Sequence, residues 1–394
     1  MDLQIRPAGP DDYREIARID GISFGTVYSD EAFDDVFSEP PNLLVATDDD
    51  RIVGITGDYR FTMTVPGGAQ LADVPGVTWV SVLPTHRRRG VLSALMTHQL
   101  VEYADAGETF SILTASEGGI YRRFGYGPAT RKVKTVVDRR FTKLLAPVDV
   151  SAVRFLSVEQ AGPLLPELHE RWRAMTPGAL SRTELWWQHL LADRDYNRGG
   201  MSQKFYLVHP DGYLAYRVAE EWNDGHPSHR CSIVDYRCTT DEAHAALWQV
   251  LLGLDLFATI ASWEIPDDDH LPFLLSNPRE VQTESVDDGV WLRPVNVARM
   301  LAARTYQVEL DAVLDVAGQR VALTGGPDGA SCSPTDRSAD IRLGLSSLGS
   351  IYLGTHRPRT LARAGLLETE DESTLGRLDL AFGTDRAAAY GTAF

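Results

Sequence analysis

Short runs of hydrophobic and polar residues follow one another along the chain, and turn-forming residues separate them. Residues 3–6 alternate between apolar and polar side chains, which predicts a strand. A helix is expected behind it, because Pro10 suits the first helical turn and the acidic residues that follow suit the helix dipole. Residues 42–46 and 52–55 flank an acidic turn and predict a hairpin. The first part of the chain therefore mixes strands with helices.

A further strand is expected over residues 76–83, and the segment behind it has a distinctive pattern. Residues 84–90 read Pro-Thr-His-Arg-Arg-Arg-Gly and precede an apolar stripe with helical spacing, formed by Leu92, Leu95 and Met96. Residues 110–127 predict a second strand, a short helix and a glycine-rich exit. We expect a strand, a basic turn, a helix and another strand in that order.

The order of elements repeats further along the chain. Residues 205–218 predict a strand, a turn and a strand, and residues 232–237 alternate like another strand. Thr239 and Thr240 with the two acids behind them offer a helix cap. From about residue 295 the pattern predicts a helix over 297–304, strands over 308–316 and 320–323, and two closing amphipathic helices. We therefore expect a mixed α/β chain of three domains, with boundaries at 1–142, 143–293 and 294–394.

Composition and charge narrow the classes of partner. The chain has 394 residues, of which 43% are hydrophobic, as in globular proteins. No apolar run approaches the ~18 residues of a membrane span, and the amino terminus has no secretory signal pattern, so a cytoplasmic protein is expected. The net charge of −17 disfavours nucleic acid as a partner, and it either favours a cationic ligand or only aids solubility. The cysteines lie in no metal-ligand spacing, so we expect no metal and no disulfide framework.

The basic turn over residues 87–90 has the chemistry of an anion site. The first amides of a helix lack intrahelical partners, and with the helix dipole and arginine side chains they favour a phosphate group. Gly90 would let the backbone approach a pyrophosphate closely. The alternative is a solvated basic turn that caps a surface helix.

Two segments together resemble the acetyl-CoA motifs of GNAT acetyltransferases. They are Arg87-x-x-Gly90 directly after a strand, and Ile120-Tyr121-Arg122-Arg123-Phe124-Gly125-Tyr126. More narrowly, residues 84–90 and 115–121 resemble the enhanced-intracellular-survival (Eis) aminoglycoside acetyltransferases. That resemblance extends to residues 207–213 and 348–354, and so spans nearly the whole chain. Leu92 departs from the general GNAT loop, where a second small residue is usual.

The resemblance implies tandem GNAT-like domains, the first active and the second degenerate, followed by an α+β domain similar to sterol carrier proteins. It implies acetyl-CoA as the acetyl donor, and a homo-hexamer. Residues 235–240 stand where the second domain would need a phosphate loop, so that domain is expected to bind no acetyl-CoA. Phe24 is expected to contact the amine substrate. The residues implied to bind the donor are Val80, Ser81, Val82, Arg88, Arg89, Gly90, Val91, Leu92, Ser93, Ser116 and Glu117.

The resemblance also assigns the catalytic roles. Tyr121 matches the family's general acid, and a phenol of pKa ~10 suits proton donation to a thiolate of pKa ~8.5. Phe394 would supply the general base through its terminal carboxylate, which at a pKa of ~3.5 needs burial or a relaying water. The alternatives are that Tyr121 only packs on the sheet and that the terminus is frayed.

The implied reaction is N-acetylation of primary amines on aminoglycosides or similar polyamines, at one or several positions, by direct attack within a ternary complex. Acetylation of protein lysines stays open as a second activity. A function of a different class also stays open, in which the chain carries an apolar ligand and its GNAT unit is vestigial.

Four other signals have ordinary structural explanations. Residues 21–25 fit a Gly-x-Ser-x-Gly nucleophile elbow, but a helix is expected before them where that motif requires a strand. We interpret His226 and His229 as a surface turn, since no further metal ligand has suitable spacing. Residues 267–270 predict a loop without the spacing of a calcium site. Trp186 and Trp187 are expected in a core or an interface.

Overall fold

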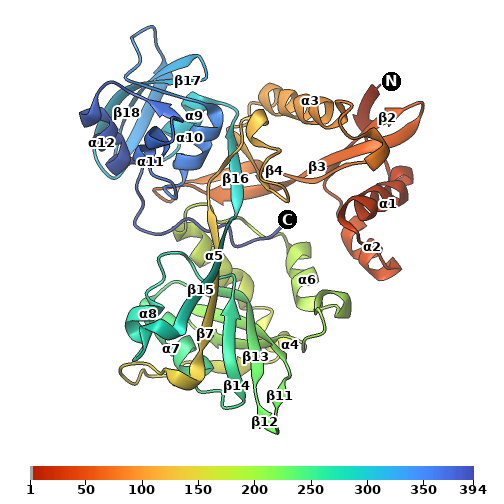
Figure 1. Ribbon diagram of the computed structural model, residues 1–394, viewed down its shortest axis with the longest axis vertical. Coiled ribbons are helices and arrows are strands. Elements are labelled where there is room, and N and C mark those ends of the chain that lie inside the picture. The colour runs from red at the N-terminus through yellow and green to blue at the C-terminus, as the bar shows by residue number, and fades with distance from the viewer. Residues whose placement is uncertain (1–2) are drawn as a thin grey trace. The chain divides into compact units, whose positions relative to one another are not determined.

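The computed structural model describes residues 3–394 and divides into two compact units. The first unit comprises residues up to 130, 289–384 and 393–394, and the second comprises 131–288 and 385–392. The elements of both units are labelled in Figure 1. The chain therefore enters each unit more than once, and its last ten residues are divided between them.

The first unit contains a seven-stranded sheet in the order β1-β2-β3-β4-β5-β16-β6. The helices α1 and α3 lie on opposite faces of this sheet (Figure 1). A core of apolar residues from both helices and from β2 and β3 holds the layers together. The strands are β1 (Leu3–Pro7), β2 (Asn42–Asp48), β3 (Arg51–Thr64), β4 (Gln70–Val82), β5 (Phe110–Thr114), β6 (Gly127–Pro128) and β16 (Val290–Pro294). The helices are α1 (Tyr13–Phe24), α2 (Asp30–Phe37) and α3 (Val91–Asp105), with short 3-10 helices at Pro10–Asp12, Pro84–His86 and Arg122–Phe124.

The same unit also contains a five-stranded sheet in the order β19-β18-β17-β20-β21. Most of its pairs are antiparallel, and β17 and β20 run parallel. Its strands are β17 (Leu310–Val316), β18 (Gln319–Gly326), β19 (Gly329–Pro334), β20 (Ile341–Leu343) and β21 (Leu367–Glu368). The helices are α9 (Val297–Ala302), α10 (Leu345–Tyr352), α11 (Pro358–Arg363) and α12 (Glu372–Ala381).

The second unit has its own seven-stranded sheet, in the order β15-β7-β14-β13-β10-β9-β8. Its core is built around α7 and the central strands. The strands are β7 (Arg131–Asp138), β8 (Arg154–Leu156), β9 (Phe205–His209), β10 (Gly212–Ala219), β13 (His229–Cys238), β14 (Phe257–Ser262) and β15 (Val281–Asp288), with a small hairpin of β11 (Trp222–Asn223) and β12 (His226–Pro227). The helices are α4 (Val158–Ala161), α5 (Leu165–Met175), α6 (Glu184–Ala192), α7 (Asp241–Leu252) and α8 (Leu271–Leu274), with short 3-10 helices at Arg139–Phe141, Asp195–Asn197 and Pro278–Glu280.

The two large sheets do not follow the order of the chain. β7 belongs to the second sheet, although it follows β6 of the first sheet almost directly. β16 returns to the first sheet, where it pairs antiparallel with β5 and with β6. Each sheet thus gains a strand from a distant part of the sequence.

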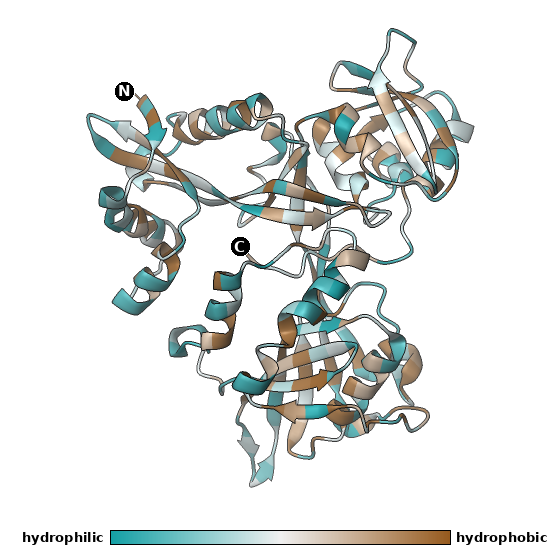
Figure 2. Cartoon of the chain, turned by 180° about the vertical axis from the view of Figure 1, so that it is seen from behind, coloured by the Kyte–Doolittle hydropathy of each residue, from teal (hydrophilic) through white to brown (hydrophobic). Residues whose placement is uncertain are grey.

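Most of the predicted elements are confirmed. The expected helix behind Pro10 is α1, and the hairpin over 42–55 is β2 with β3. The side chain of Thr240 accepts a hydrogen bond from the Ala243 amide, so it caps α7 as expected. Among residues 3–394 no helix is both long and apolar enough to cross a lipid bilayer. Figure 2 shows hydrophilic and hydrophobic residues mixed along α3, which has 15 residues.

Three local expectations are wrong. Behind β5 the expected short helix is only a 3-10 turn, Arg122–Phe124, because Gly125 takes a left-handed conformation that ends it at once. Three helices rather than two follow β20, since α11 is a separate element of six residues. His229 is buried in β13 rather than exposed in a turn, and its ring accepts a hydrogen bond from the Glu221 amide.

Candidate functional site

A cleft opens in the first unit where two parallel strands separate. β4 and β5 pair at only two positions, Gly76 with Ile112 and Val77 with Leu113. Beyond these pairs, residues 78–82 of β4 and Thr114 of β5 line a cleft of about 990 Å³. Backbone amide and carbonyl groups that no neighbouring strand pairs require another partner. The edge of β4 that faces β5 can therefore pair with the amide groups of an elongated ligand.

A bulge in β4 fixes the wall of this cleft. Trp79 has a φ of +55°, and the register between β3 and β4 shifts close to it. The indole packs against Tyr28, with ring centroids 5.9 Å apart, and against Phe37, at 5.5 Å. A bulge of this kind redirects the side chains of a strand, and the aromatic contacts hold the strained residue in place.

The N-terminus of α3 forms one end of the cleft. Arg88 and Gly90 both have left-handed φ values, of +60° and +86°, so the turn presents its backbone toward the start of the helix. In the part of the chain that the structure describes, no side chain caps this helix and its first turn holds no acid. The first amides of α3 and the helix dipole are therefore available to an anion.

The arginines of this turn have different surroundings. Arg87 and Arg88 line the cleft, and the Arg87 Nε donates a bond of 3.4 Å to the Val82 carbonyl. The side chain of Arg89 lies 4.0 Å from the Asp48 carboxylate instead. His86 Nε2 is 3.6 Å from the same carboxylate. Asp48 thus holds the outer side of the turn, while its inner side faces the cleft.

Tyr121 reaches the cleft from the turn behind β5. Its side chain is buried, and its ring packs edge-on against Tyr126 at 6.2 Å between centroids. Burial, and then the negative charge of Glu117, raise the pKa of Tyr121 to about 12. The phenol is therefore protonated at neutral pH and can act as a proton donor.

The chain ends inside the same cleft. The Phe394 ring packs against Phe61, with centroids 4.9 Å apart, and lies close to Gly76, where a Cβ atom would come within 2.9 Å of it. The Thr114 hydroxyl donates a hydrogen bond of 3.3 Å to a terminal oxygen of Phe394. The terminus is therefore packed and hydrogen-bonded, which contradicts the alternative of a frayed end.

A buried carboxylate completes the wall at the end of α1. Asp20 lies on the buried face of this helix and accepts hydrogen bonds from Tyr28 (2.8 Å) and Ser81 (3.2 Å). Burial raises the pKa of Asp20 above its ordinary value, although both hydrogen bonds oppose the rise. Phe24, the last residue of α1, lines the cleft and is 52% exposed, so its ring is free to contact a ligand.

The structure brings nearly all the predicted site residues together. Thirteen of the fourteen line the cleft, and Arg89 is the exception. Sequence reasoning missed Asp20, Tyr28, Trp79 and Thr114, which also line it. The one available signal was Asp20, an acid within the apolar helical stripe that contains Ile16 and Ile19. Residues 21–25 form the end of α1 and its cap, so the nucleophile-elbow motif lacks the strand it needs.

The second unit has the same strand-to-helix arrangement without the phosphate site. β13 runs into α7 as β4 runs into α3. In α7, however, Thr240 caps the helix and Asp241 and Glu242 occupy its first turn. Negative side chains at a helix N-terminus oppose the binding of a phosphate group. This end of the second sheet therefore disfavours acetyl-CoA.

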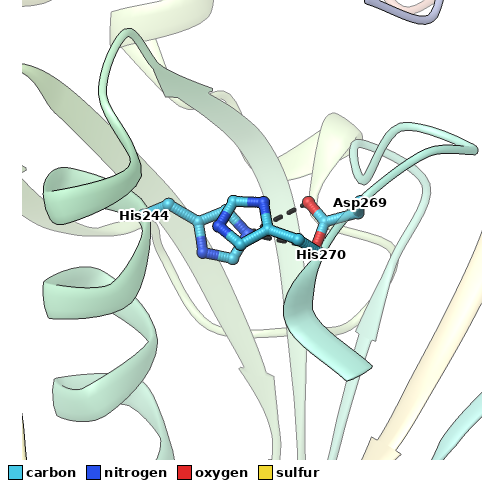
Figure 3. Close-up of side chains that lie close together, drawn as sticks. All are labelled: His244, Asp269 and His270. Carbon is cyan, nitrogen blue, oxygen red and sulfur yellow. Dashed lines mark hydrogen bonds and ion pairs between the residues drawn. The ribbon is translucent and has the colours of Figure 1, made fainter. Parts of the chain in front are cut away.

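Two histidines and an aspartate meet in the second unit, between α7 and the loop before α8. His244 Nε2 lies 3.0 Å from the Asp269 carboxylate, and the rings of His244 and His270 stack at 4.2 Å (Figure 3). Their ligand atoms lie within 4.8 Å of one another. A metal ion must lie near the plane of each imidazole that binds it. Stacked rings do not direct their nitrogens at one point, so we interpret the group as a clamp between helix and loop.

Comparison with known proteins identifies the family. Residues 4–129 and 178–299 match two families that are both described as acetyltransferase (GNAT) domains, and residues 297–390 match the sterol carrier protein domain. The N-acetyltransferase Eis of Mycobacterium tuberculosis is 41% identical over 344 residues, which cover 85% of this chain and 84% of that protein. An uncharacterized N-acetyltransferase of Streptomyces coelicolor is 36% identical over 350 residues, with 85% and 84% covered.

A solved structure agrees with these matches. Eis1 from Mycobacterium abscessus superposes with a TM-score of 0.89 at 32% identity, covering 99% of this chain and 100% of that one. Two GNAT domains followed by a sterol-carrier domain confirm the predicted fold class. The relatives also favour an enzyme over a non-catalytic carrier. The chain therefore belongs to the Eis family of N-acetyltransferases within the GNAT superfamily.

Proposed function

We propose that this chain transfers an acetyl group from acetyl-CoA to primary amines of aminoglycosides or similar cationic polyamines, at one or several positions. One observation carries the proposal. A single cleft is lined by the uncapped N-terminus of α3, by the protonated Tyr121 and by the carboxyl terminus of the chain. These are an anion site, a proton donor and a proton acceptor, which together meet the needs of amine acetylation.

The residues of the cleft fit acetyl-CoA. The separated edge of β4 at Val80–Val82 offers backbone partners for the pantetheine amides. Arg88 and the backbone of residues 90–93 would hold the pyrophosphate at the start of α3. Ser116 and Glu117 lie farther along the same cleft. Acetyl-CoA, when bound, supplies an acetyl group activated as a thioester.

Two groups of this chain, the terminal carboxylate and the Tyr121 phenol, then accept and donate the protons of the reaction. The acceptor reacts as a neutral amine, after its ammonium form has lost one proton to solvent. The terminal carboxylate of Phe394 accepts the second proton as this amine attacks, and the Thr114 hydroxyl holds one of its oxygens in place. As the new C–N bond forms and the C–S bond breaks, the Tyr121 phenol donates its proton to the departing sulfur. Return of the proton from the carboxyl group to the phenolate, directly or through water, restores both groups.

The charges of the cleft support a cationic acceptor. Asp20 and the terminal carboxylate are negative groups on the α1 side and at the chain end, while Arg87 and Arg88 lie beside α3. A negative patch in a cleft concentrates cations, and the net charge of −17 acts in the same direction. An amine and a phosphate-bearing donor are thus drawn to different parts of one cleft.

The test is CoA release from acetyl-CoA with a panel of aminoglycosides and one lysine-rich peptide. The thiols freed are counted per acceptor molecule, and product masses identify the acetylated positions. Release with aminoglycosides, at one or more thiols per molecule, is the expected result. Release with the peptide alone would replace the polyamine with protein lysine as the substrate. A folded protein that releases no CoA with any of these amines would contradict the proposal.

A further inference from the structure

The C-terminal tail lies along one edge of the second unit before the chain ends. The Ala389 amide donates to the Pro177 carbonyl and the Leu180 amide donates to the Tyr390 carbonyl, both at 3.0 Å. The hydroxyl of Thr392, which is fully buried, donates to the Leu180 carbonyl at 3.3 Å. Three hydrogen bonds, two of them between backbone groups, therefore tie residues 389–392 to residues 177–180.

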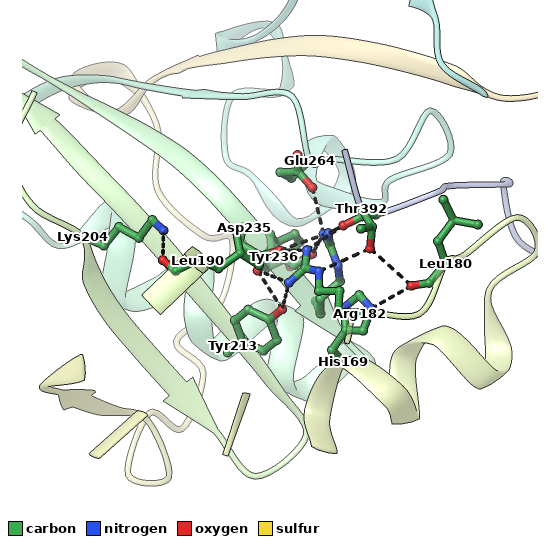
Figure 4. A network of polar contacts seen from close by, with 12 residues as sticks. His169, Leu180, Arg182, Leu190, Lys204, Tyr213, Asp235, Tyr236, Glu264 and Thr392 are labelled. Carbon is green, nitrogen blue, oxygen red and sulfur yellow. Dashed lines mark hydrogen bonds and ion pairs between the residues drawn. The ribbon is translucent and has the colours of Figure 1, made fainter. Parts of the chain in front are cut away.

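Two buried arginines bind the tail at one atom. Arg182 Nη2 donates a hydrogen bond of 2.6 Å to the Gly391 carbonyl, and Arg237 Nη2 donates to the same oxygen. Arg182 Nε also donates to the Thr392 hydroxyl at 3.3 Å. Figure 4 shows Thr392 beside Arg182 within a network of polar side chains. A carbonyl that accepts from two guanidinium groups is held firmly, because hydrogen bonds from charged donors are the strong ones.

The network keeps both guanidinium groups in place. Arg182 pairs with Asp235 at 2.7 Å, and Arg237 pairs with Asp235 at 3.0 Å and with Glu264 at 2.9 Å. Burial would raise the pKa of Asp235, but the charges of the two arginines outweigh it and lower that pKa below its ordinary value. Burial and the same two charges lower the pKa of His169 to about 2, so the imidazole is neutral. The positive charges of Arg182 and Arg237 are thus balanced by the negative charges of Asp235 and Glu264 inside the unit.

Arg237 lies at a point of the second unit that has a counterpart in the first unit. Arg237 lies at the end of β13, just before α7. The corresponding end of β4 in the first unit leads into the basic turn over residues 87–90. In the second unit, the capped start of α7 leaves no such anion site, and the strand end instead donates a hydrogen bond to the tail.

We propose that the second unit is a binding site for the chain's own C-terminal tail, with Arg182 and Arg237 as positioning residues for the terminal carboxylate. The proposal rests on the proposed function, in which that carboxylate is the base. Two residues separate Gly391 from Phe394, and three chain steps span at most about 10 Å. Fixing the Gly391 carbonyl therefore limits where the terminal carboxylate can go. This gives the degenerate unit a role in the reaction of the first.

Gly391→Ala is the variant that tests the proposal without altering a buried charge. Gly391 has a φ of +66°, and a Cβ atom there would lie 2.5 Å from Trp172 and 3.1 Å from Arg237 Nη2. The control is Gly199→Ala in the same unit, where φ is +58° and the added Cβ meets nothing within 4 Å. Thr392→Val is a second, nearly isosteric variant that removes the hydroxyl bound by Arg182. Arg237→Gln is avoided, because it would leave Asp235 and Glu264 underpaired in the core.

Two measurements are made on the folded full-length proteins. The first is the rate at which carboxypeptidase A releases the terminal Phe394, a readout that does not depend on acetyltransferase activity of this chain. The second is kcat, KM for the amine and the affinity for CoA. We expect Gly391→Ala to lose Phe394 at least about tenfold faster than the parent and to lose kcat by a similar factor with unchanged CoA affinity. Thr392→Val should change in the same direction by less, and Gly199→Ala should match the parent.

The outcomes separate this proposal from the proposed function. Equal release of Phe394 from Gly391→Ala, Thr392→Val and the parent would overturn the tail-binding proposal, whatever the activity. Faster release with unchanged kcat would show that the tail is bound but that its position does not serve the reaction, which also overturns the proposal. A parent protein inactive on every amine would contradict the proposed function, while the release rates would still report on tail binding.

Discussion

The hydroxyl of Thr114, at the end of β5, donates a hydrogen bond of 3.3 Å to the terminal carboxylate of Phe394, 280 residues farther along the chain. Thr114 lies where β5 has already separated from β4. This contact places the proton acceptor of the proposed reaction at the opening between the two strands, in the cleft that Tyr121 also lines.

Thr114→Val removes this hydrogen bond with little change in shape. One hydrogen bond contributes ~0.5–1.5 kcal/mol, so we expect kcat to fall by about two- to tenfold. The KM for acetyl-CoA should not change, because the hydroxyl holds the acceptor group and not the donor molecule. Thr114→Ser keeps the hydroxyl and is the matched control. Equal kcat values for the Val and Ser variants would show that the contact does not orient the carboxylate.

Tyr121→Phe removes the proposed proton donor and keeps the ring that packs against Tyr126. Loss of a general acid typically costs about 100-fold or more in kcat. The pH dependence gives a second check. Because the pKa of Tyr121 is raised to about 12, the phenol is protonated, and active as a donor, at every lower pH. Wild-type kcat measured from pH 6 to 10 should therefore show no alkaline loss centred near 10, and such a loss would contradict the role.

Asp20→Asn tests the negative wall of the cleft. The substitution keeps the shape of the side chain that contacts Tyr28 and Ser81 but removes its charge. We expect KM for a cationic aminoglycoside to rise by about tenfold, which corresponds to the loss of ~1.4 kcal/mol of attraction. The affinity for acetyl-CoA serves as the internal control. An unchanged KM for the amine would mean that Asp20 only supports the fold of α1.

Titration calorimetry with CoA should give one site per chain. The start of α3 has free amides and basic neighbours, whereas the start of α7 is capped by Thr240 and carries two acids. In Gly90→Ala, an alanine at a φ of +86° costs ~1–2 kcal/mol, so the free turn relaxes away from the conformation that CoA needs and binding should weaken by roughly tenfold. Thr240→Ala should leave the affinity unchanged. Binding of two CoA molecules per chain would contradict the assignment of the second unit.

The sequence was informative wherever a function depends on contiguous residues. The strand, basic turn and helix over residues 76–105 are local, and periodicity with helix-capping rules predicts them. The capped start of α7 was predicted for the same reason. The resemblance to a family placed thirteen of fourteen site residues in one cleft, which no periodicity could have done.

Long-range relationships were not predictable in this way. The exchange of β7 and β16 between the large sheets depends on pairing partners more than 120 residues apart, as in the pairing of β7 with β14 and of β16 with β5. The network around Arg237 joins the carbonyl of Gly391 to residues 182, 235 and 264, whose charges look like surface charges in the sequence. The short helix expected before Gly125 is only a 3-10 turn, because the left-handed glycine and not helix propensity determines this turn.

In the proposed reaction, the chain ends in the cleft of the first unit and its terminal carboxylate is the base. The most direct test adds a single glycine after Phe394 and measures kcat and CoA affinity together. The extension moves the carboxylate by one residue and leaves the Phe394 ring and its contact with Phe61 in place. We expect a loss of kcat of about 100-fold or more, as for other catalytic bases, with CoA binding intact. An extended protein that turns over at the wild-type rate would contradict it.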